Sequence, residues 1–310
     1  MMMIEINDLQ KKFKEVHALK GISLTVKKGE IYGFIGKNGA GKSTTMNILA
    51  GLSKPLSGSC TVNGRDVTKI SHPGELSMGY LPESPSFYGW MTARESLEYL
   101  AESDPSKKGK TRQADISEML SWVGLEQVAG RRIGGFSRGM KQRLGLCQIL
   151  MHQPDLLILD EPSSALDPEG RSEILRLIRE LNHMGKTIIF SSHILSDVER
   201  VCHTVGMIAD GKMLMEKPLQ DMLQTNLSPI YDLELVRPLG DEMVQNLLLQ
   251  NSIMQVDHQA GDRLSIAVKD MEAGSRSIMA WFADRQIPLR SLSLKKHSLE
   301  DIFVQEVNGK

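Results

Sequence analysis

The sequence predicts an α/β fold with a mostly parallel sheet, followed by a smaller α+β unit. Short apolar runs bounded by turn residues alternate with segments of helical periodicity over the first two thirds of the chain. A glycine-rich stretch, Gly36–Thr44, joins one such run to a helical segment. The pattern changes after Lys217-Pro218, so we place one domain at residues 1–220 and a second at residues 221–310.

The core strands of the first domain are predicted from apolar runs. Ile31–Ile35 lies between Gly29 and Gly36, as is typical of a short buried strand. Three further runs are predicted as buried strands: Leu156–Asp160, Thr187–Ser191 and Val205–Ala209. Arg171–Asn182 places four apolar residues on one helical face: Ile174, Leu177, Ile178 and Leu181. Strands that alternate with helices imply a mostly parallel sheet.

Residues from about 85 to 150 have no strong strand signal and are predicted to be helical. One helical face is formed by Ile116, Met119, Leu120 and Val123. The polar stretch Asp104–Lys110 interrupts the helices. We interpret this region as a helical insert in the α/β core.

The second domain is predicted to follow the order β-α-β-β-α-β with one further helix, the order of a ferredoxin-like α+β unit. The predicted strands are Tyr231–Val236, Ile253–His258, Arg263–Val268 and Arg290–Lys295. The predicted helices are Asp241–Leu249, Ala273–Arg285 and Ser298–Val307. Its sequence carries no motif that points to chemistry, so a structural appendage, a dimer contact and a regulatory surface all stay open.

Composition and charge exclude several classes of protein. The 310 residues carry a formal net charge of -1, without an overall basic field, so we expect no nucleic-acid partner. The three cysteines lie far apart and form no CxxC pair, which argues against a zinc knuckle and fits a reducing compartment. No apolar run approaches the roughly 18 residues of a membrane span, and the first residues lack a signal pattern. We therefore expect a soluble chain that works at a membrane only through another protein.

The glycine-rich stretch predicts a phosphate-binding loop. Glycines let backbone N–H groups wrap phosphate oxygens, and the following helix aims its positive end at the same anion. Lys42 is expected to reach the β- and γ-phosphates, and the Ser43 hydroxyl to bind Mg²⁺. The predicted nucleotide-binding residues of this loop are Gly36, Lys37, Asn38, Gly39, Ala40, Gly41, Lys42, Ser43 and Thr44.

Two adjacent carboxylates end the apolar strand that begins at Leu156. Ligands of α/β proteins bind at such strand ends. Asp160 is expected to hold Mg²⁺ through water, and Glu161 to act as general base toward the attacking water. A solvated strand end is the alternative, and the phosphate loop makes it the weaker one.

Ser137 and Gly139 precede a helix rich in basic and amide side chains. A small hydroxyl residue and a bare backbone at a helix start can form a second anion site. One nucleotide has no need for both the phosphate loop and this helix start of the same chain. In two copies packed head to tail, each chain would place its helix start against the nucleotide of the other. An ordinary helix cap is the alternative that these residues leave open when taken alone.

Taken together, these motifs resemble the ATP-binding subunits of ABC transporters over about residues 3–220. Gly36–Thr44 looks like the Walker A motif, and Leu156–Pro162 like Walker B with its catalytic glutamate. Further matches, in the family's order, are the signature at Phe136–Met140, the D-loop at Ser164–Asp167 and the switch histidine His193. Phe13 stands where the family has an aromatic residue that stacks on adenine.

The resemblance implies an ATPase that dimerises around two Mg-ATP and drives separate transmembrane permease subunits at the cytoplasmic face of the membrane. His193 would contact the γ-phosphate, and Asp167 would belong to the nucleotide sandwich. The motifs resemble most the export branch for drugs, antibiotics or sodium, whose subunits often carry a C-terminal accessory domain. Both halves of a site are present, which favours a homodimer, although pairing with a different cassette stays open.

The chain departs from the family pattern at several positions. Glu83 replaces the usual glutamine of the Q-loop; it can still approach Mg²⁺ or its water but cannot donate a hydrogen bond. In the signature, Arg138 replaces a glycine and Met140 a glutamine. Lys37 stands where proline is frequent, and Phe13 replaces tyrosine but keeps the stacking face.

Alternatives of other classes are weaker. A translation factor of the same superfamily usually carries two cassettes, and a repair ATPase needs a long coiled-coil insertion. A kinase or GTPase would leave the signature unexplained. The aromatic stretch Phe87–Trp90 suggests either a groove for a helix of the membrane partner or packing within the helical insert.

Overall fold

The computed structural model describes residues 1–70, 75–102, 110–225, 227–259, 262–296 and 298–308. The chain forms two compact units. One comprises Met1–Leu219 with Glu306–Lys310, and the other comprises Gln220–Gln305. Within the described residues, no helix combines the length and apolarity that crossing a bilayer requires.

A six-stranded sheet forms the centre of the first unit, in the order β10-β9-β3-β8-β7-β6. Its strands are β3 (Ile31–Ile35), β6 (Met78–Leu81), β7 (Leu156–Asp160), β8 (Thr187–Ser192), β9 (Thr204–Ala209) and β10 (Lys212–Pro218). All neighbours are parallel except β10 and β9. Every residue of β3, β7 and β8 is buried, because both faces of this sheet are covered. The four predicted core strands are confirmed to within one residue at each end.

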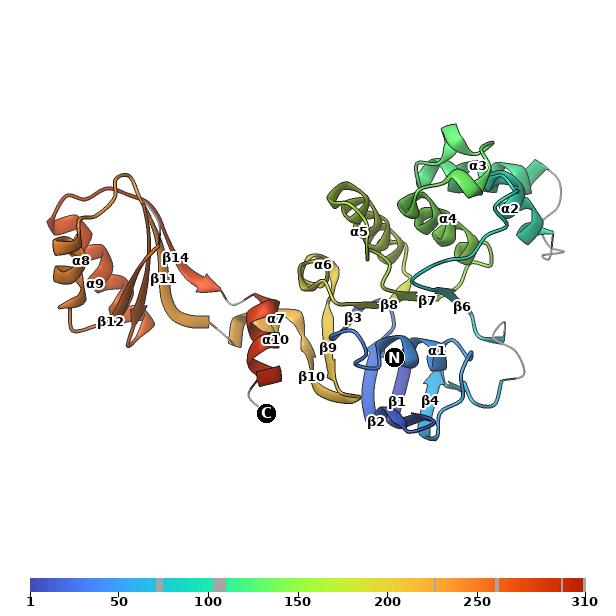
Figure 1. The fold of residues 1–310 in the computed structure, drawn as a ribbon, viewed down its shortest axis with the longest axis horizontal. Helices are drawn as coiled ribbons and strands as arrows, with labels where there is room; N and C mark the ends of the chain where they lie inside the picture. The colour runs from blue at the N-terminus through green and yellow to red at the C-terminus, as the bar shows by residue number, and fades with distance from the viewer. Residues whose placement is uncertain (71–74, 103–109, 226, 260–261, 297, 309–310) are drawn as a thin grey trace. The chain divides into compact units, whose positions relative to one another are not determined.

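A second, antiparallel sheet packs below the first in Figure 1, in the order β2-β1-β4-β5. Its strands are β1 (Met2–Phe13), β2 (Val16–Lys27), β4 (Ser57–Val62) and β5 (Arg65–Asp66). They were not predicted from the sequence. Buried and exposed residues alternate along β2, and irregularities interrupt the pairing of β1 with both of its neighbours.

Helices cover both faces of the central sheet. The helix α1 (Lys42–Leu49) contacts β7 on one side and β4 on the other, between the two sheets. On the opposite face lie α5 (Pro168–His183) and α6 (Leu195–Val201), against β8 and β3 (Figure 1). The predicted apolar face of α5 is confirmed, because all four of its residues are buried.

The helical insert contains α2 (Ala93–Ala101), α3 (Lys110–Trp122) and α4 (Arg138–Leu150), with short 3-10 turns at Glu126–Val128 and Ile133–Gly135. The Thr92 hydroxyl accepts from the Glu95 amide, and the Glu95 carboxylate accepts from the Thr92 amide, so a capping box starts α2. Most of the predicted polar break, residues 104–109, lies outside the described residues.

The second unit has its own antiparallel sheet, in the order β12-β13-β11-β14. Its strands are β11 (Leu227–Leu235), β12 (Ile253–Gln259), β13 (Arg263–Val268) and β14 (Leu289–Lys296). The helices α8 (Asp241–Leu248) and α9 (Met271–Asp284) alternate with them, and the apolar core includes Trp281 and Phe282. The element order is the one predicted. The remaining helices are α7 (Leu219–Thr225) and α10 (Leu299–Asn308).

Candidate functional site

A polar cavity of about 640 Å³ lies at the end of β3, around the start of α1. It gathers residues from the phosphate loop and from segments far away in the sequence. Its walls are Val16, His17, Ala18, Lys20, Asn38, Gly39, Gly41, Lys42, Ser43, Thr44, Glu83, Glu161, Asp210 and Gly211. The structure therefore brings most of the loop together with Glu83 and Glu161.

The loop conformation depends on its glycines. Gly39 and Gly41 have φ of 82° and 112°, in the left-handed region that disfavours other residues. A Cβ on Gly41 would come within 2.7 Å of the Leu19 side chain and 2.9 Å of the Ala18 carbonyl oxygen. Among the described residues, no side chain caps the start of α1, so its first N–H groups have no side-chain acceptor and are available to bind an anion.

Lys42 is buried in this cavity and has three acceptors. Its Nζ donates to the carbonyl oxygens of Gly36, at 2.7 Å, and Lys37, at 3.3 Å. The same nitrogen lies 3.2 Å from Glu161 Oε1. An ammonium group has three protons, so a phosphate oxygen must replace at least one of these acceptors.

Two hydroxyls orient the Asp160 carboxylate. Ser191 Oγ donates to Asp160 Oδ1 at 2.6 Å, and Ser43 Oγ donates to the same atom at 3.2 Å. Burial raises the pKa of Asp160, and the charges of Glu161 and Glu83 raise it further, although the two hydroxyl bonds lower it. The Asp160 carboxylate thus lies within hydrogen-bond distance of the Ser43 hydroxyl, which is predicted to bind Mg²⁺.

Glu161 joins the lysine to the histidine. While Oε1 faces Lys42, Oε2 lies 2.8 Å from His193 Nδ1. The Glu161 amide donates to Ser191 Oγ at 2.9 Å. Its φ is 50°, an unusual value for a residue with a side chain. Such backbone strain persists only where the surroundings enforce it, which here are the contacts to both side-chain oxygens and to the amide.

A buried network ties together the segments that carry Glu161 and His193. Ser163 Oγ donates to Asp197 Oδ2 at 2.6 Å, and Arg171 Nη2 lies 2.6 Å from Asp197 Oδ1. Ser163 follows Glu161 by two residues, and Asp197 follows His193 by four. Sequence reasoning did not identify this network, because no motif marks Asp197.

The predicted site residues Ser137, Gly139 and Asp167 are not among the walls of this cavity. Ser137 starts α4, where its hydroxyl accepts from the Met140 amide at 3.2 Å, and Gly139 lies in the first turn. Asp167 caps α5 by accepting from the Gly170 amide at 2.8 Å. Ser137 therefore has the helix-cap geometry that was the alternative interpretation of this stretch, and Asp167 caps α5 in the same way.

Phe13 is also not a cavity wall. Its ring is half exposed, and Lys11 Nζ lies 4.8 Å from the ring centroid. Its cross-strand neighbour Val16 does line the cavity. The segment Val16–Lys20 and the turn residues Asp210 and Gly211 complete the walls without having been predicted. The Asp-Gly pair does signal a hairpin turn, but the sequence does not indicate that this turn meets the loop.

The donor set around Ser43 suits a hard cation that keeps several waters. Within the part of the chain that the structure describes, no group of three or more His, Cys, Asp or Glu side chains could hold a metal ion. Mg²⁺ usually takes only one or two protein carboxylates and completes its shell with water and phosphate oxygens. The Ser43 hydroxyl and the Asp160 carboxylate fit this requirement.

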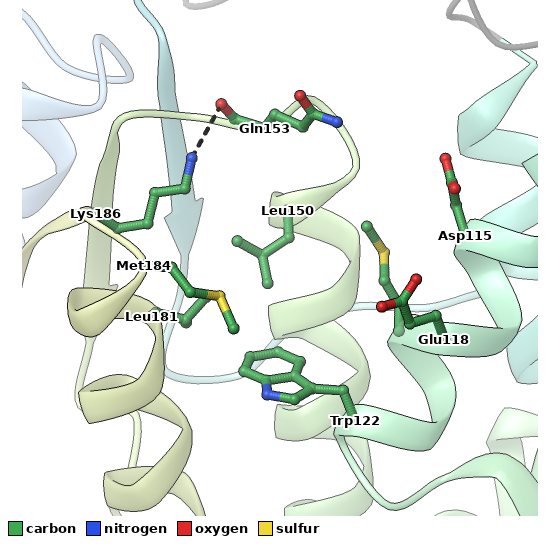
Figure 2. A pocket seen from close by; sticks show the side chains of 9 residues that line it. Asp115, Glu118, Trp122, Leu150, Gln153, Leu181, Met184 and Lys186 are labelled. Atoms are coloured by element: carbon green, nitrogen blue, oxygen red, sulfur yellow. Dashed lines mark hydrogen bonds between the residues drawn. The ribbon is translucent and has the colours of Figure 1, made fainter.

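A smaller cavity of about 350 Å³ lies between the helical insert and α5 (Figure 2). Its side chains Trp122, Leu150, Leu181 and Met184 point toward one another. Trp122 Nε1 donates to Glu180 Oε2 at 2.8 Å, and Glu180 does not line the cavity. The cavity is predominantly apolar and contains no phosphate loop, so the chemistry belongs to the larger cavity.

Comparison with known proteins agrees with the motifs. The family description "ABC transporter" matches residues 19–164. The uncharacterized ABC transporter ATP-binding protein YxlF of Bacillus subtilis is 38% identical over 308 residues, covering 99% of this chain and 100% of YxlF. The bacitracin transport ATP-binding protein BcrA of Bacillus licheniformis is 36% identical over 307 residues, covering 99% of this chain and 97% of BcrA.

The solved structures show the same fold. The dimeric structure of a post-hydrolysis state of the ATP-binding cassette MJ0796, bound to ADP and Pi, is 25% identical with a TM-score of 0.64. That similarity covers 70% of this chain and 99% of MJ0796.

Proposed function

This chain belongs to the ABC transporter family as an ATP-binding, ATP-hydrolysing subunit, and we propose that it powers export through separate transmembrane permease subunits. One arrangement carries the proposal: Glu161 lies between Lys42 of the phosphate loop and His193, at 3.2 Å and 2.8 Å. A binding protein without chemistry would have no need for a buried carboxylate at this position.

The phosphate loop binds the nucleotide in this proposal. Backbone N–H groups of Asn38 to Thr44 and the start of α1 receive the phosphates, and Lys42 turns from Glu161 to the β- and γ-phosphate oxygens. Phe13 provides a stacking face for adenine. Its proximity in the sheet to Val16, a wall of the cavity, supports this role.

Ser43 and Asp160 are the residues that would hold Mg²⁺, with Glu83 at the edge of the cavity. The bound Mg²⁺ would neutralise charge that develops on the transferring phosphate. The Ser191 bond keeps Asp160 oriented toward Ser43, which supports this assignment.

Glu161 acts as the general base. Once Lys42 turns to the phosphates, Glu161 Oε1 becomes free to accept a proton from the attacking water. His193 keeps hold of Oε2, which fixes the direction of the carboxylate, and it can contact the γ-phosphate from the same position. The strained backbone at Glu161 and its bond to Ser191 support a preorganised role.

Two chains form the working assembly. Ser137 and Gly139 lie outside the cavity of their own chain, so we propose that they contact the γ-phosphate held by a partner, together with Asp167. The dimer of the related cassette MJ0796 supports this assembly. Because one chain carries both halves of the site, we propose a homodimer.

The permease contact is proposed at the aromatic stretch before α2. Tyr88 and Trp90 are 59% and 65% exposed, and their ring centroids lie 5.8 Å apart. Exposed paired aromatics at this density favour a docking surface over packing within the insert. The similarity to a bacitracin transport protein supports an antibiotic-like cargo, and the membrane partner would hold the chain at the cytoplasmic face.

Affinity capture tests the proposal. Tagged Glu161→Gln protein with Mg-ATP is used to capture partners from gently solubilised native membranes, which are identified by mass spectrometry. We expect a multi-spanning membrane protein in near-stoichiometric yield, and loss of that protein in a Tyr88→Ser/Trp90→Ser control. Ribosomal proteins or nucleic acid without a membrane partner would contradict the transport function and favour a soluble member of the superfamily.

A further inference from the structure

The walls of the nucleotide cavity carry more negative than positive side chains. Three carboxylates line it, Glu83, Glu161 and Asp210, against two ammonium groups, Lys20 and Lys42. A fourth carboxylate, Asp160, lies directly behind Ser43. This excess opposes the entry of a nucleotide polyphosphate, which is itself strongly anionic. A cation close to these walls would therefore matter for binding.

Arg138 is placed to supply that positive charge. It is the first residue of α4, and its Nη2 lies 3.3 Å from Glu83 Oε1, which follows β6. The two residues are 55 positions apart in the sequence, so only the fold brings them together. Both are also positions where the chain departs from the motif that it resembles: the family has glutamine and glycine, without charge.

We propose that Arg138 is a positioning residue for the nucleotide site of its own chain, which neutralises Glu83 and holds its carboxylate at the cavity edge. The inference rests on the proposed function and adds a residue to the site. Arg138 would otherwise be expected to face only the nucleotide of a partner chain, as its neighbours Ser137 and Gly139 do.

Exposure of the pair limits the expected size of the effect. The Arg138 and Glu83 side chains are 42% and 51% exposed, and ion pairs in water contribute little to folding. Arg138 acts on the nucleotide site by fixing and neutralising the Glu83 carboxylate, and not through fold stability. Its effect should therefore appear in nucleotide affinity, fade at high ionic strength and depend on the presence of Glu83.

A double-mutant cycle on nucleotide affinity tests the inference. Binding of a fluorescent ADP analogue with Mg²⁺ is titrated for the wild type, Arg138→Gln, Glu83→Gln and the double variant, at low and high ionic strength. ADP has no γ-phosphate, so contacts that a partner chain makes to that group do not contribute. Arg138→Lys keeps the charge, and Lys69→Gln removes a surface cation paired with Asp66 elsewhere in the same unit.

We expect Arg138→Gln to weaken binding about two- to fivefold at low salt, as for a solvent-exposed charge pair. In the Glu83→Gln background, the same substitution should not change the affinity for the analogue. Arg138→Lys should bind the analogue nearly as tightly as the wild type, and Lys69→Gln should leave the affinity unchanged. An equal loss with and without Glu83, or no loss at all, would overturn the inference. If the wild type itself failed to bind the analogue, the proposed function would fail, and this inference with it.

Discussion

The two cavities of the first unit differ in what surrounds their ionisable groups. In the nucleotide cavity, Lys42 and Glu161 are both buried, and each of them contacts several partners. In the cavity of Figure 2, the apolar residues Trp122, Leu150 and Leu181 face inward. Its charged residues belong to the rim, where Lys186 donates to the Gln153 carbonyl oxygen at 3.4 Å.

This difference separates a site whose groups lower the free energy of unfolding from a site whose groups raise it. Buried charges and a strained Glu161 backbone oppose folding, and they persist because each group holds another in place. Apolar side chains around the smaller cavity contribute to folding and have no chemical role. Substitutions in the first cavity should therefore change turnover, and substitutions in the second should change stability.

The largest effect is expected for Glu161→Gln. An amide cannot accept a proton from water, so kcat should fall by about 10²- to 10⁴-fold, the typical contribution of a general base. Nucleotide affinity should be kept or increased, because Lys42 loses its anionic partner. Phosphate release and titration with a nucleotide analogue measure the two effects. Undiminished hydrolysis would remove Glu161 from its proposed role.

Leu181→Ala tests the other side of the comparison. Leu181 is 2% exposed and lines the apolar cavity, so its truncation should lower the free energy of unfolding by about 2–5 kcal/mol. Urea denaturation measures this loss, and the KM for Mg-ATP should stay unchanged. Leu177→Ala, on the same helix but away from the cavity, is the matched control and should cost a similar amount. A shift in KM without a loss of stability would contradict the division between the cavities.

Asp160→Asn should raise the stability of the folded chain, by less than Leu181→Ala lowers it. Burial raises the pKa of Asp160 above its ordinary value of 3.8. Between pH 3.8 and the raised pKa, the folded state therefore binds more protons than the unfolded state. Wild-type stability is therefore lost across that window, and an asparagine avoids the loss. We expect a nucleotide-free Tm higher by about 1–4 °C at neutral pH and no gain below pH 3.8. A lower Tm at neutral pH would show that the two hydroxyl bonds outweigh the burial of the charge.

The sequence predicted the fold best where one physical pattern decides the structure. The strands β3, β7 and β8 are buried on both faces, so each is a continuous apolar run. The strands β1 and β2 have one open face, and irregular pairing interrupts their alternation, which hides them. In the second unit, β13 has three consecutive buried residues and was predicted with its observed bounds.

For the site, local motifs were predictable and long-range contacts were not. The loop, Asp160, Glu161 and His193 each carry a recognisable motif, and the structure brings them together. The bond between Ser163 and Asp197 and the pair of Glu83 with Arg138 join segments 34 and 55 residues apart. Neither contact follows from spacing along the chain, because each depends on how distant elements pack.

The most direct test of the central claim is the solution mass of Glu161→Gln protein, measured by light scattering with and without Mg-ATP. A nucleotide-sandwich dimer requires Ser137 and Gly139 of each chain to meet the phosphates that its partner holds. We expect a monomer of 34.5 kDa without nucleotide and a mass twice as large with saturating Mg-ATP. A mass that stays at 34.5 kDa while nucleotide is demonstrably bound would contradict the claim that two of these chains close around ATP.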